Sequence, residues 1–270
     1  MKTTTLLAAT FAVLAVTACG KPSSANLSLS ARASTAGSTS NTTASSLDLG
    51  NGISLTEVRF VVRKLKLEGT STTAAGATTA PSTTDAESDG KTEVEHEQDD
   101  DADEPVLGPL VVDLDGATLA GGGLSNVFEG VVPGGTFDEL KFVIGPVKEA
   151  QAGSDAKLAA MAAQGASIVI DGTVTDASGT TTSFEFVSSL AVEVKQENDV
   201  EVNDTKSNNI TLSIDPTGWF GGTGAARLDP TPANQAAIET NIKASLRAFQ
   251  DDDKNGDEDH DGGDDGSSHD

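Results

Sequence analysis

The sequence predicts a mainly β protein, an antiparallel β-sandwich with one or two helices. Several short segments alternate apolar and polar residues, which is the pattern of strands that bury one face. Turn-forming runs of Gly, Pro, Asp and Ser separate these segments, and this spacing is typical of sandwiches and open barrels. Only two stretches have the composition or the spacing of a helix.

The predicted strands begin with the clearest alternation in the chain. In residues 58–63 the apolar side chains at 58, 60 and 62 alternate with the arginines at 59 and 63. Leu65 and Leu67 fall on the opposite parity, which predicts a bulge near Lys64. A turn at residues 176–179 predicts a hairpin between the strands on either side of it. Further strands are predicted at residues 110–114, 140–144, 168–170, 184–186, 192–194, 200–202 and 210–214.

Two helices are predicted. The first, at residues 154–164, is rich in alanine and ends before Gly165, which suits a helix stop. The second begins at Thr231, a possible cap, with Pro232 in the favoured first position. Its apolar side chains recur at helical spacing and are Ile238, Ile242, Leu246 and Phe249. We expect this stripe to pack against the sheet.

The N-terminus predicts export and a lipid anchor. Lys2, a short apolar run at residues 6–16 and the small residues after it are typical of a signal peptide, here residues 1–18. The run is too short to span a bilayer, which needs about 20 apolar residues. The tetrapeptide Val16-Thr17-Ala18-Cys19 resembles the lipobox of bacterial lipoproteins. The resemblance implies cleavage before Cys19 and attachment of acyl chains, such as palmitate, to that residue.

The lipobox resemblance also implies a partner and a location. The partner is the membrane, held through the lipid on Cys19, and the location is the bacterial cell envelope. Gly20 follows the cysteine where an Asp would resemble an inner-membrane retention signal, which favours the outer membrane. Because Cys19 is the only cysteine, its lipidation excludes a disulfide and a catalytic thiol. The alternative is an ordinary signal peptide with an incidental cysteine.

Composition divides the rest of the chain into a body and three polar segments. Residues 19–50 are rich in Ser, Thr, Ala, Asn and Gly and are expected to form a lipidated, disordered tether. The body is expected at residues 51–250. A disordered acidic insertion at residues 69–105 interrupts it, and a disordered Asp-rich tail at residues 251–270 follows it.

The net charge of −25 is concentrated in two of these segments. Residues 85–104 carry eleven acidic side chains and one lysine, and residues 251–270 carry ten acidic side chains and one lysine. Such blocks repel themselves and stay solvated. A nucleic-acid partner is excluded, because binding phosphates requires clustered Lys and Arg.

Three stretches of the body resemble bacterial lipoproteins that carry a domain of unknown function. These are LTEVR at residues 55–59, GPLVVDL at residues 108–114 and VPGGTFDELKF at residues 132–142. The resemblance spans residues 53–250. It implies a transthyretin-like β-sandwich in which the Pro-Gly turn leads into a strand with alternate residues buried. It implies no activity.

The C-terminal tail contains a candidate calcium site. Its spacing matches the first part of the calcium loop D-x-[DN]-x-[DN]-G, with Gly256 at the bend, whereas Gly262 stands where such a loop needs a bidentate Glu. The predicted ligands are Asp251, Asp253, Asn255, Asp257, Asp259 and Asp261. Affinity would be about millimolar, as in extracellular modules. The alternative is a solvated tail without metal.

Other catalytic and binding patterns are weak. The histidines His96, His260 and His269 all lie in acidic segments, so a Ser-His nucleophile is not expected. A carboxylate pair could act as acid and base, but the candidates alternate with apolar residues and are more simply outward-facing strand positions. They are Asp113, Asp115, Asp138, Glu139, Glu185 and Glu193. Trp219 and Phe220 are expected to cover one end of the core.

These observations favour a non-enzymatic structural or interaction module held on the membrane. Envelope proteins and anionic polymers are its expected partners, and calcium is a possible cofactor of its tail. The absence of tyrosine and the single tryptophan argue against a carbohydrate-binding groove. Two alternatives stay open. One is a periplasmic or surface binding protein for a small apolar ligand, and the other is a carboxylate-based hydrolase.

Overall fold

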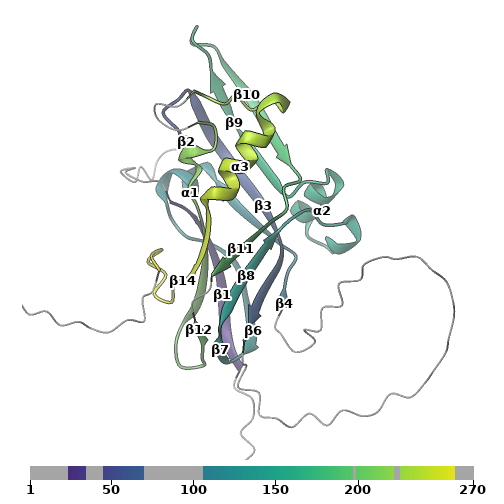
Figure 1. The fold of residues 1–270 in the computed structure, drawn as a ribbon, viewed down its shortest axis with the longest axis vertical. Helices are drawn as coiled ribbons and strands as arrows, with labels where there is room; N and C mark the ends of the chain where they lie inside the picture. Colours follow the sequence, from purple (N-terminus) through teal and green to yellow (C-terminus); the bar gives the residue numbers. More distant parts are fainter. Residues whose placement is uncertain (1–23, 35–44, 70–105, 197–198, 222–225, 259–270) are drawn as a thin grey trace, which may run out of the picture.

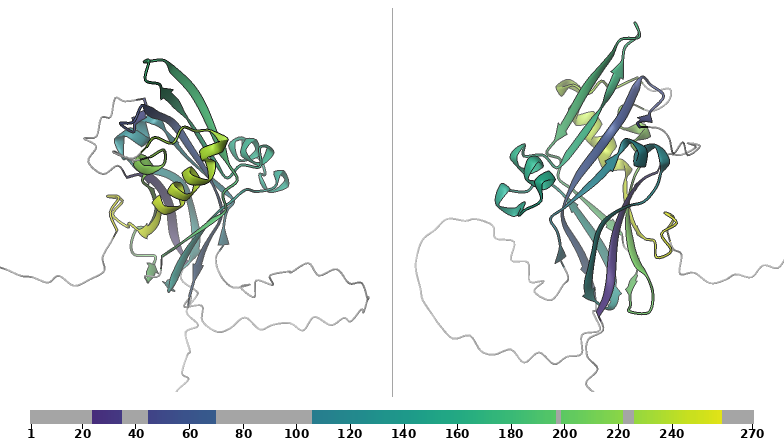
Figure 2. Two further views of the ribbon diagram at one scale, coloured as in Figure 1. Left: turned by 45° about the horizontal axis from the view of Figure 1, so that its top comes forward. Right: turned by 180° about the vertical axis from the view of Figure 1, so that it is seen from behind.

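The protein is mainly β, and its two principal sheets face each other in an open, sandwich-like arrangement (Figures 1 and 2). The structure is a computed structural model that describes residues 24–34, 45–69, 106–196, 199–221 and 226–258. The predicted β class is therefore confirmed. The predicted signal peptide, Cys19 and all of the predicted insertion except its first position, Gly69, lie outside these residues.

The larger sheet is built around one long strand, β3 (Ile53–Glu68). Its strand order is β10-β9-β3-β8-β11, and β2, β4 and β5 also pair with β3. The other members are β2 (Leu47–Asp48), β4 (Val106–Leu107), β5 (Leu110–Asp115), β8 (Glu139–Ile144), β9 (Ile168–Thr175), β10 (Thr181–Ser188) and β11 (Val192–Gln196). All its pairings are antiparallel. The register between β3 and β8 shifts between Val62 and Lys64, which confirms the predicted bulge, and β9 and β10 form the predicted hairpin.

The smaller sheet has the order β14-β13-β1-β6. Its strands are β1 (Ser24–Ala33), β6 (Ser125–Pro133), β13 (Asn208–Ile214) and β14 (Leu246–Gln250). β1 pairs antiparallel with β6 but parallel with β13, so the predicted sandwich is not purely antiparallel. β7 (Gly135–Phe137) and β12 (Val200–Val202) form a separate two-stranded pair.

The existence of β1 corrects the predicted tether at residues 19–50. Leu27, Leu29 and Ala31 are each at most 1% exposed and alternate with Ser28, Ser30 and Arg32. This period of two is the signature of a strand. The Ser- and Ala-rich composition of the region concealed it, because composition averages over the alternation. The folded body therefore includes residues 24–33, well before the predicted start at residue 51.

Among the described residues there are three α-helices and three short 3-10 turns. They are α1 (Gly116–Gly121), α2 (Ala156–Ala163), α3 (Gln235–Ser245), η1 (Glu149–Gln151), η2 (Pro216–Gly218) and η3 (Pro232–Asn234). α2 confirms the predicted first helix and is capped by Asp155, whose carboxylate accepts from the amides of Lys157 and Leu158. α1 was not predicted. No helix in the described part of the chain is long and apolar enough to cross a bilayer.

The second predicted helix is partly wrong. Pro232 opens η3, where Thr231 makes no side-chain capping bond, and α3 then ends at Ser245. Leu246 and Phe249 belong to strand β14. Their spacing fits a helix. As a strand, however, β14 pairs with the outer edge of β13 and supplies hydrogen-bonding partners for the β13 backbone. Tertiary pairing therefore overrides the local pattern.

The core fills the space between the sheets, and the two residues that follow η2, Trp219 and Phe220, belong to it. Trp219 and Phe220 are both 0% exposed, which confirms them as core residues. The Trp219 ring meets Phe60 edge-on with centroids 6.1 Å apart, and its Nε1 donates to the Ser245 hydroxyl at 2.7 Å. The buried polar end of the indole is thus satisfied.

We predict that Leu29→Ala lowers the free energy of unfolding by about 2–5 kcal/mol, because it leaves a cavity beside β1 in the core. Denaturant unfolding of the two proteins measures the difference. Ser24→Ala, at the exposed first position of β1, is the matched control and should change stability by less than about 0.5 kcal/mol. An unaltered stability in Leu29→Ala would mean that residues 24–33 form a free tether after all.

Candidate functional site

A row of buried polar side chains lies between β1 and β13, and we call it the polar seam. It consists of Ser28, Ser30, Asn209, Thr211 and Asp251, the last three of which are 0% exposed. The parallel register places Ser28 opposite Asn209 and Ser30 opposite Thr211. The inward-facing residues of both strands are apolar, so the seam occupies the opposite face of the smaller sheet.

The seam is a continuous chain of hydrogen bonds. The Ser28 and Ser30 hydroxyls both donate to Oδ1 of Asn209, at 2.8 and 2.9 Å. The side-chain amide of Asn209 donates to the Thr211 hydroxyl at 3.0 Å, and that hydroxyl donates to Oδ2 of Asp251 at 2.8 Å. A buried polar network is stabilising only when its members are satisfied, as they are here. This series of hydrogen bonds ends at Asp251, a carboxylate of the predicted calcium site.

That carboxylate organises the residues that follow β14. Both oxygens of Asp251 accept from the Gly256 amide, at 3.2 and 3.1 Å, and its carbonyl accepts from the Lys254 amide at 3.1 Å. Lys254 and Gly256 have positive φ angles of 56° and 88°. The amide of Asn255 donates to Asp253 at 3.0 Å, and that of Asp257 donates to Oδ1 of Asn255 at 2.6 Å. These bonds fold residues 251–258 into a compact turn, which we call the C-terminal loop.

The C-terminal loop corrects the prediction that the tail is disordered from residue 251. The charge pattern alone favours a solvated tail. It does not reveal that the seam supplies a hydroxyl donor for Asp251, that Arg32 donates to the carbonyl of Gly256, or that Asp252 accepts from the Asn209 amide at 3.1 Å. The loop is therefore docked on β1 and β13, at the side of the smaller sheet away from the core.

Four of the six predicted calcium ligands lie in this loop. Asp251 is buried, whereas Asp253, Asn255 and Asp257 are exposed around it. Asp259 and Asp261 lie outside the described residues. In the part of the chain that the structure describes, no three carboxylate, His or Cys side chains gather closely enough to hold a metal ion. Oδ1 of Asp251 accepts only the Gly256 amide, so one of its lone pairs remains for a further donor or a cation.

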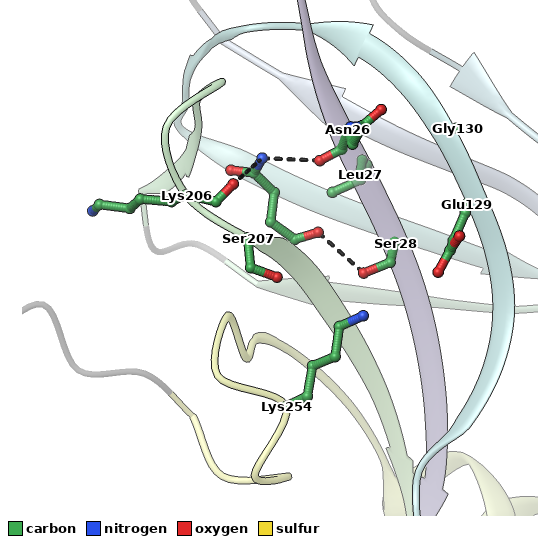
Figure 3. Close-up of a pocket in the computed structure, with 9 residues that line it drawn as sticks. Asn26, Leu27, Ser28, Glu129, Gly130, Lys206, Ser207 and Lys254 are labelled. Carbon is green, nitrogen blue, oxygen red and sulfur yellow. Dashed lines mark hydrogen bonds between the residues drawn. The ribbon is translucent and has the colours of Figure 1, made fainter.

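An open pocket of about 410 Å³ adjoins the C-terminal loop (Figure 3). Its walls come from β1, β6, the turn before β13 and the loop itself, and they are largely polar. Lys254 extends from the loop toward Ser28, and Glu129 stands on β6 (Figure 3). The side-chain amide of Asn208 donates to the carbonyls of Asn26 and Asn203, at 2.9 and 2.7 Å, which fixes the turn. Such walls suit a small polar molecule better than the apolar ligand of the alternative hypothesis.

A second open pocket, of about 320 Å³, lies between the end of β13 and α3. Asp215, Thr217, Asn241 and Arg247 are among its lining residues, so its walls also carry polar side chains. Neither of these two pockets enters the core between the sheets. They give no support to an apolar ligand enclosed in the sandwich.

A cluster of five charged side chains lies where β3, β5, β9 and α2 meet. Arg59 reaches Asp171 at 2.7 Å and Glu57 at 3.4 Å, and Lys157 pairs with Asp113. The carboxylate of Asp113 also acts on Glu57, whose pKa it raises. The sequence analysis proposed Asp113 but missed Glu57, because only the register of β3 with its neighbours brings these carboxylates together.

Burial raises the pKa of Glu57, and the neighbouring carboxylates of Asp113 and Asp171 raise it further, while Arg59 acts in the opposite direction. Glu57 and Asp113 are nevertheless poorly placed for acid-base catalysis. The side chain of Glu57 is 36% exposed and that of Asp113 is 21% exposed. Each of the two carboxylates is held in an ion pair, Glu57 with Arg59 and Asp113 with Lys157. The cluster therefore has the properties of a surface ion-pair network.

The other candidate carboxylates confirm the simpler interpretation. Asp115 caps α1 by accepting from the Thr118 amide at 2.8 Å, and this bond lowers its pKa. Glu139 and Glu193 pair with Lys195 at 3.2 and 3.1 Å. Asp138 and Glu185 are exposed. His96, His260 and His269 all lie outside the described residues.

Comparisons of the chain with protein-family profiles, with curated proteins and with solved structures find no match. The resemblance to transthyretin-like lipoprotein domains therefore stays a prediction beyond the sandwich-like arrangement itself. Function has to be argued from this chain alone.

We predict that Glu57→Gln stabilises the protein relative to the wild type as the pH rises from about 4 to 7. A raised pKa in the folded state means that stability present below the unfolded pKa is lost as Glu57 ionises, and glutamine cannot ionise. The gain should stay below about 1 kcal/mol, because solvent screens this half-exposed group. Unfolding by urea at several pH values measures it. Glu185→Gln on β10 is the control, and a Glu57→Gln variant that tracks the wild type at every pH contradicts the prediction.

Proposed function

We propose that the protein is a bacterial envelope lipoprotein, anchored by lipid on Cys19, whose β-sandwich acts as a non-enzymatic structural or interaction module. The observation that carries the proposal is the lipobox-like Val16-Thr17-Ala18-Cys19 at the end of a signal-peptide pattern. Its placement supports it further, because the buried strand β1 begins only five residues later. The outer membrane is the proposed location, on the basis of Gly20.

The energetics of acylation favour stable attachment. Each buried methylene contributes about 0.8 kcal/mol, and a single chain holds a protein only marginally. Two or three chains on one residue would hold it firmly. Several charged groups of the body pair with one another, as in the Glu57 cluster, so we assign membrane attachment to the acyl chains and not to protein charges.

The interaction role is supported by how the chain distributes its charge. Residues 85–104 and 251–270 hold −19 of the net charge of −25, so the rest of the chain is nearly balanced. Divalent cations would bridge such segments to an envelope protein or an anionic polymer. The pockets lend no weight to the apolar-ligand alternative, and the geometry of Glu57 and Asp113 lends none to the hydrolase alternative.

We further propose that the C-terminal loop binds calcium weakly. The fully buried Asp251 is held by neutral donors from Thr211 and Gly256, and Asp253, Asn255 and Asp257 follow it at the spacing of calcium ligands. A cation between Asp251 and Asp253 would offset the repulsion of their carboxylates. Asp259 and Asp261 would then supply further oxygen ligands.

We predict that Cys19→Ser moves the protein from the membrane fraction to the soluble fraction, because the acyl chains have no other attachment point. Fractionation and mass spectrometry of the N-terminal peptide measure both effects. Thr17→Ser, which keeps the cysteine, is the matched control and should remain membrane-bound and acylated. A Cys19→Ser protein that pellets with membranes as the wild type does, together with an unmodified wild-type peptide, would overturn the proposed anchor.

We predict that calcium binds the mature protein with a dissociation constant of about 0.1–1 mM and shifts the NMR signal of the Gly256 amide. Asp253→Ala should weaken binding about tenfold, because it removes one charged ligand. Asp204→Ala, an exposed aspartate in the turn before β13, should leave binding unchanged. Calorimetry without heat, and a Gly256 signal that stays in place up to about 10 mM calcium, would remove calcium from the proposal.

A further inference from the structure

The start of β1 ties one end of the body closely to Cys19. Ser24 follows the cysteine by five residues, and a fully extended chain of that length spans at most about 18 Å. β1 cannot lengthen this reach by peeling away, because Ala25 and Leu27 are 2% and 1% exposed in the core. Its first residue is also paired with Pro133 of β6.

We infer that this end of the body faces the bilayer and that Val131 lies at the lipid surface. The inference rests on the proposed anchor at Cys19. In Figure 1 the start of β1, the end of β6 and the pair β7 and β12 lie together at the lower end of the molecule, and the β9–β10 hairpin lies at the upper end. The tied end is therefore opposite to the hairpin along the longest axis.

The chemistry of this end suits a lipid surface. Val131 is 68% exposed. Within the described residues, Val131 and Val106 are the only large hydrophobic side chains that are exposed. Val131 pairs with Asn26, only two residues from the start of β1, or about 7 Å along the strand. β6 is the outer strand of the smaller sheet, so no further strand of that sheet covers its outer edge.

The distribution of charged and apolar side chains selects which side of this end is nearest the lipid. On the larger sheet, Lys141 pairs with Glu68 at 2.5 Å and with Glu139 at 3.3 Å, so that side carries charged groups. On the smaller sheet, the exposed Val131 of β6 is apolar, and removing apolar surface from water is favourable. The β6 side, with Val131, is therefore the side placed against the membrane.

A depth measurement tests this orientation. Lipidation consumes the only native cysteine, so a cysteine introduced at Val131 is the single free thiol for a fluorophore. The acylated protein is placed in vesicles that contain a nitroxide-labelled lipid. The label at Val131→Cys should be quenched at least about twofold more strongly than one at Ser178→Cys, in the far turn of the hairpin, because quenching requires proximity to the bilayer.

A longer linker shows whether Val131 is held near the bilayer by the short tether or by its own affinity for lipid. Twenty Gly and Ser residues inserted between Ser23 and Ser24 lengthen the r.m.s. reach of the tether from about 12 Å to about 28 Å. Quenching at position 131 should then fall to the level seen at position 178. Equal quenching at the two positions without the insertion, or strong quenching at 131 despite it, would overturn the orientation.

Flotation and mass spectrometry of the same samples keep the two proposals distinguishable. A protein that does not float with the vesicles and carries no lipid contradicts the anchor. A protein that is acylated and floats, but whose two labels are quenched equally, contradicts only the orientation.

Discussion

The parallel pairing of β1 with β13 is the contact on which the rest of the structure depends. It joins residues about 180 positions apart, since Leu27 lies opposite Asn208 and Ala33 opposite Ile214. Without β1, the smaller sheet would separate into β6 on one side and β13 with β14 on the other. Such long-range pairing must overcome a large loop-closure entropy, and the buried apolar face of β1 supplies the compensating free energy.

The same pairing explains why β1 and β13 are buried on both faces. Their inner faces pack into the core, while their outer faces carry the polar seam, which the C-terminal loop covers. An apolar outer face would also tolerate burial, but it would not hold the acidic loop in place. The seam instead offers the Thr211 hydroxyl and, through β1, the Arg32 guanidinium. Buried polar groups thereby specify where an otherwise strongly charged segment docks.

Sequence reasoning succeeded where a segment's own pattern decided its structure. The alternation in β3, β8 and β13, the hairpin turn and the helix α2 were all found in that way. It failed where a distant partner decided the outcome. Leu246 and Phe249 fit a helix until β13 is known to need a neighbour, and the Ser- and Ala-rich β1 looks like a tether until its alternation is considered. The candidate site was also predictable only in part. The spacing from Asp251 to Asp257 was visible, whereas the seam beneath it and the partnership of Glu57 with Asp113 depend on register.

The seam also makes strand β1 and the C-terminal loop parts of one folding unit. Ser28 and Ser30 reach Asp251 through Asn209 and Thr211, so loss of β1 would strip the loop of its support. The relation is reciprocal, because any cation that binds the ordered loop stabilises the state in which β1 is paired. At a concentration of 100 times its dissociation constant, such a ligand adds about 2.7 kcal/mol. Calcium around the protein would therefore strengthen the strand that leads to the proposed membrane anchor.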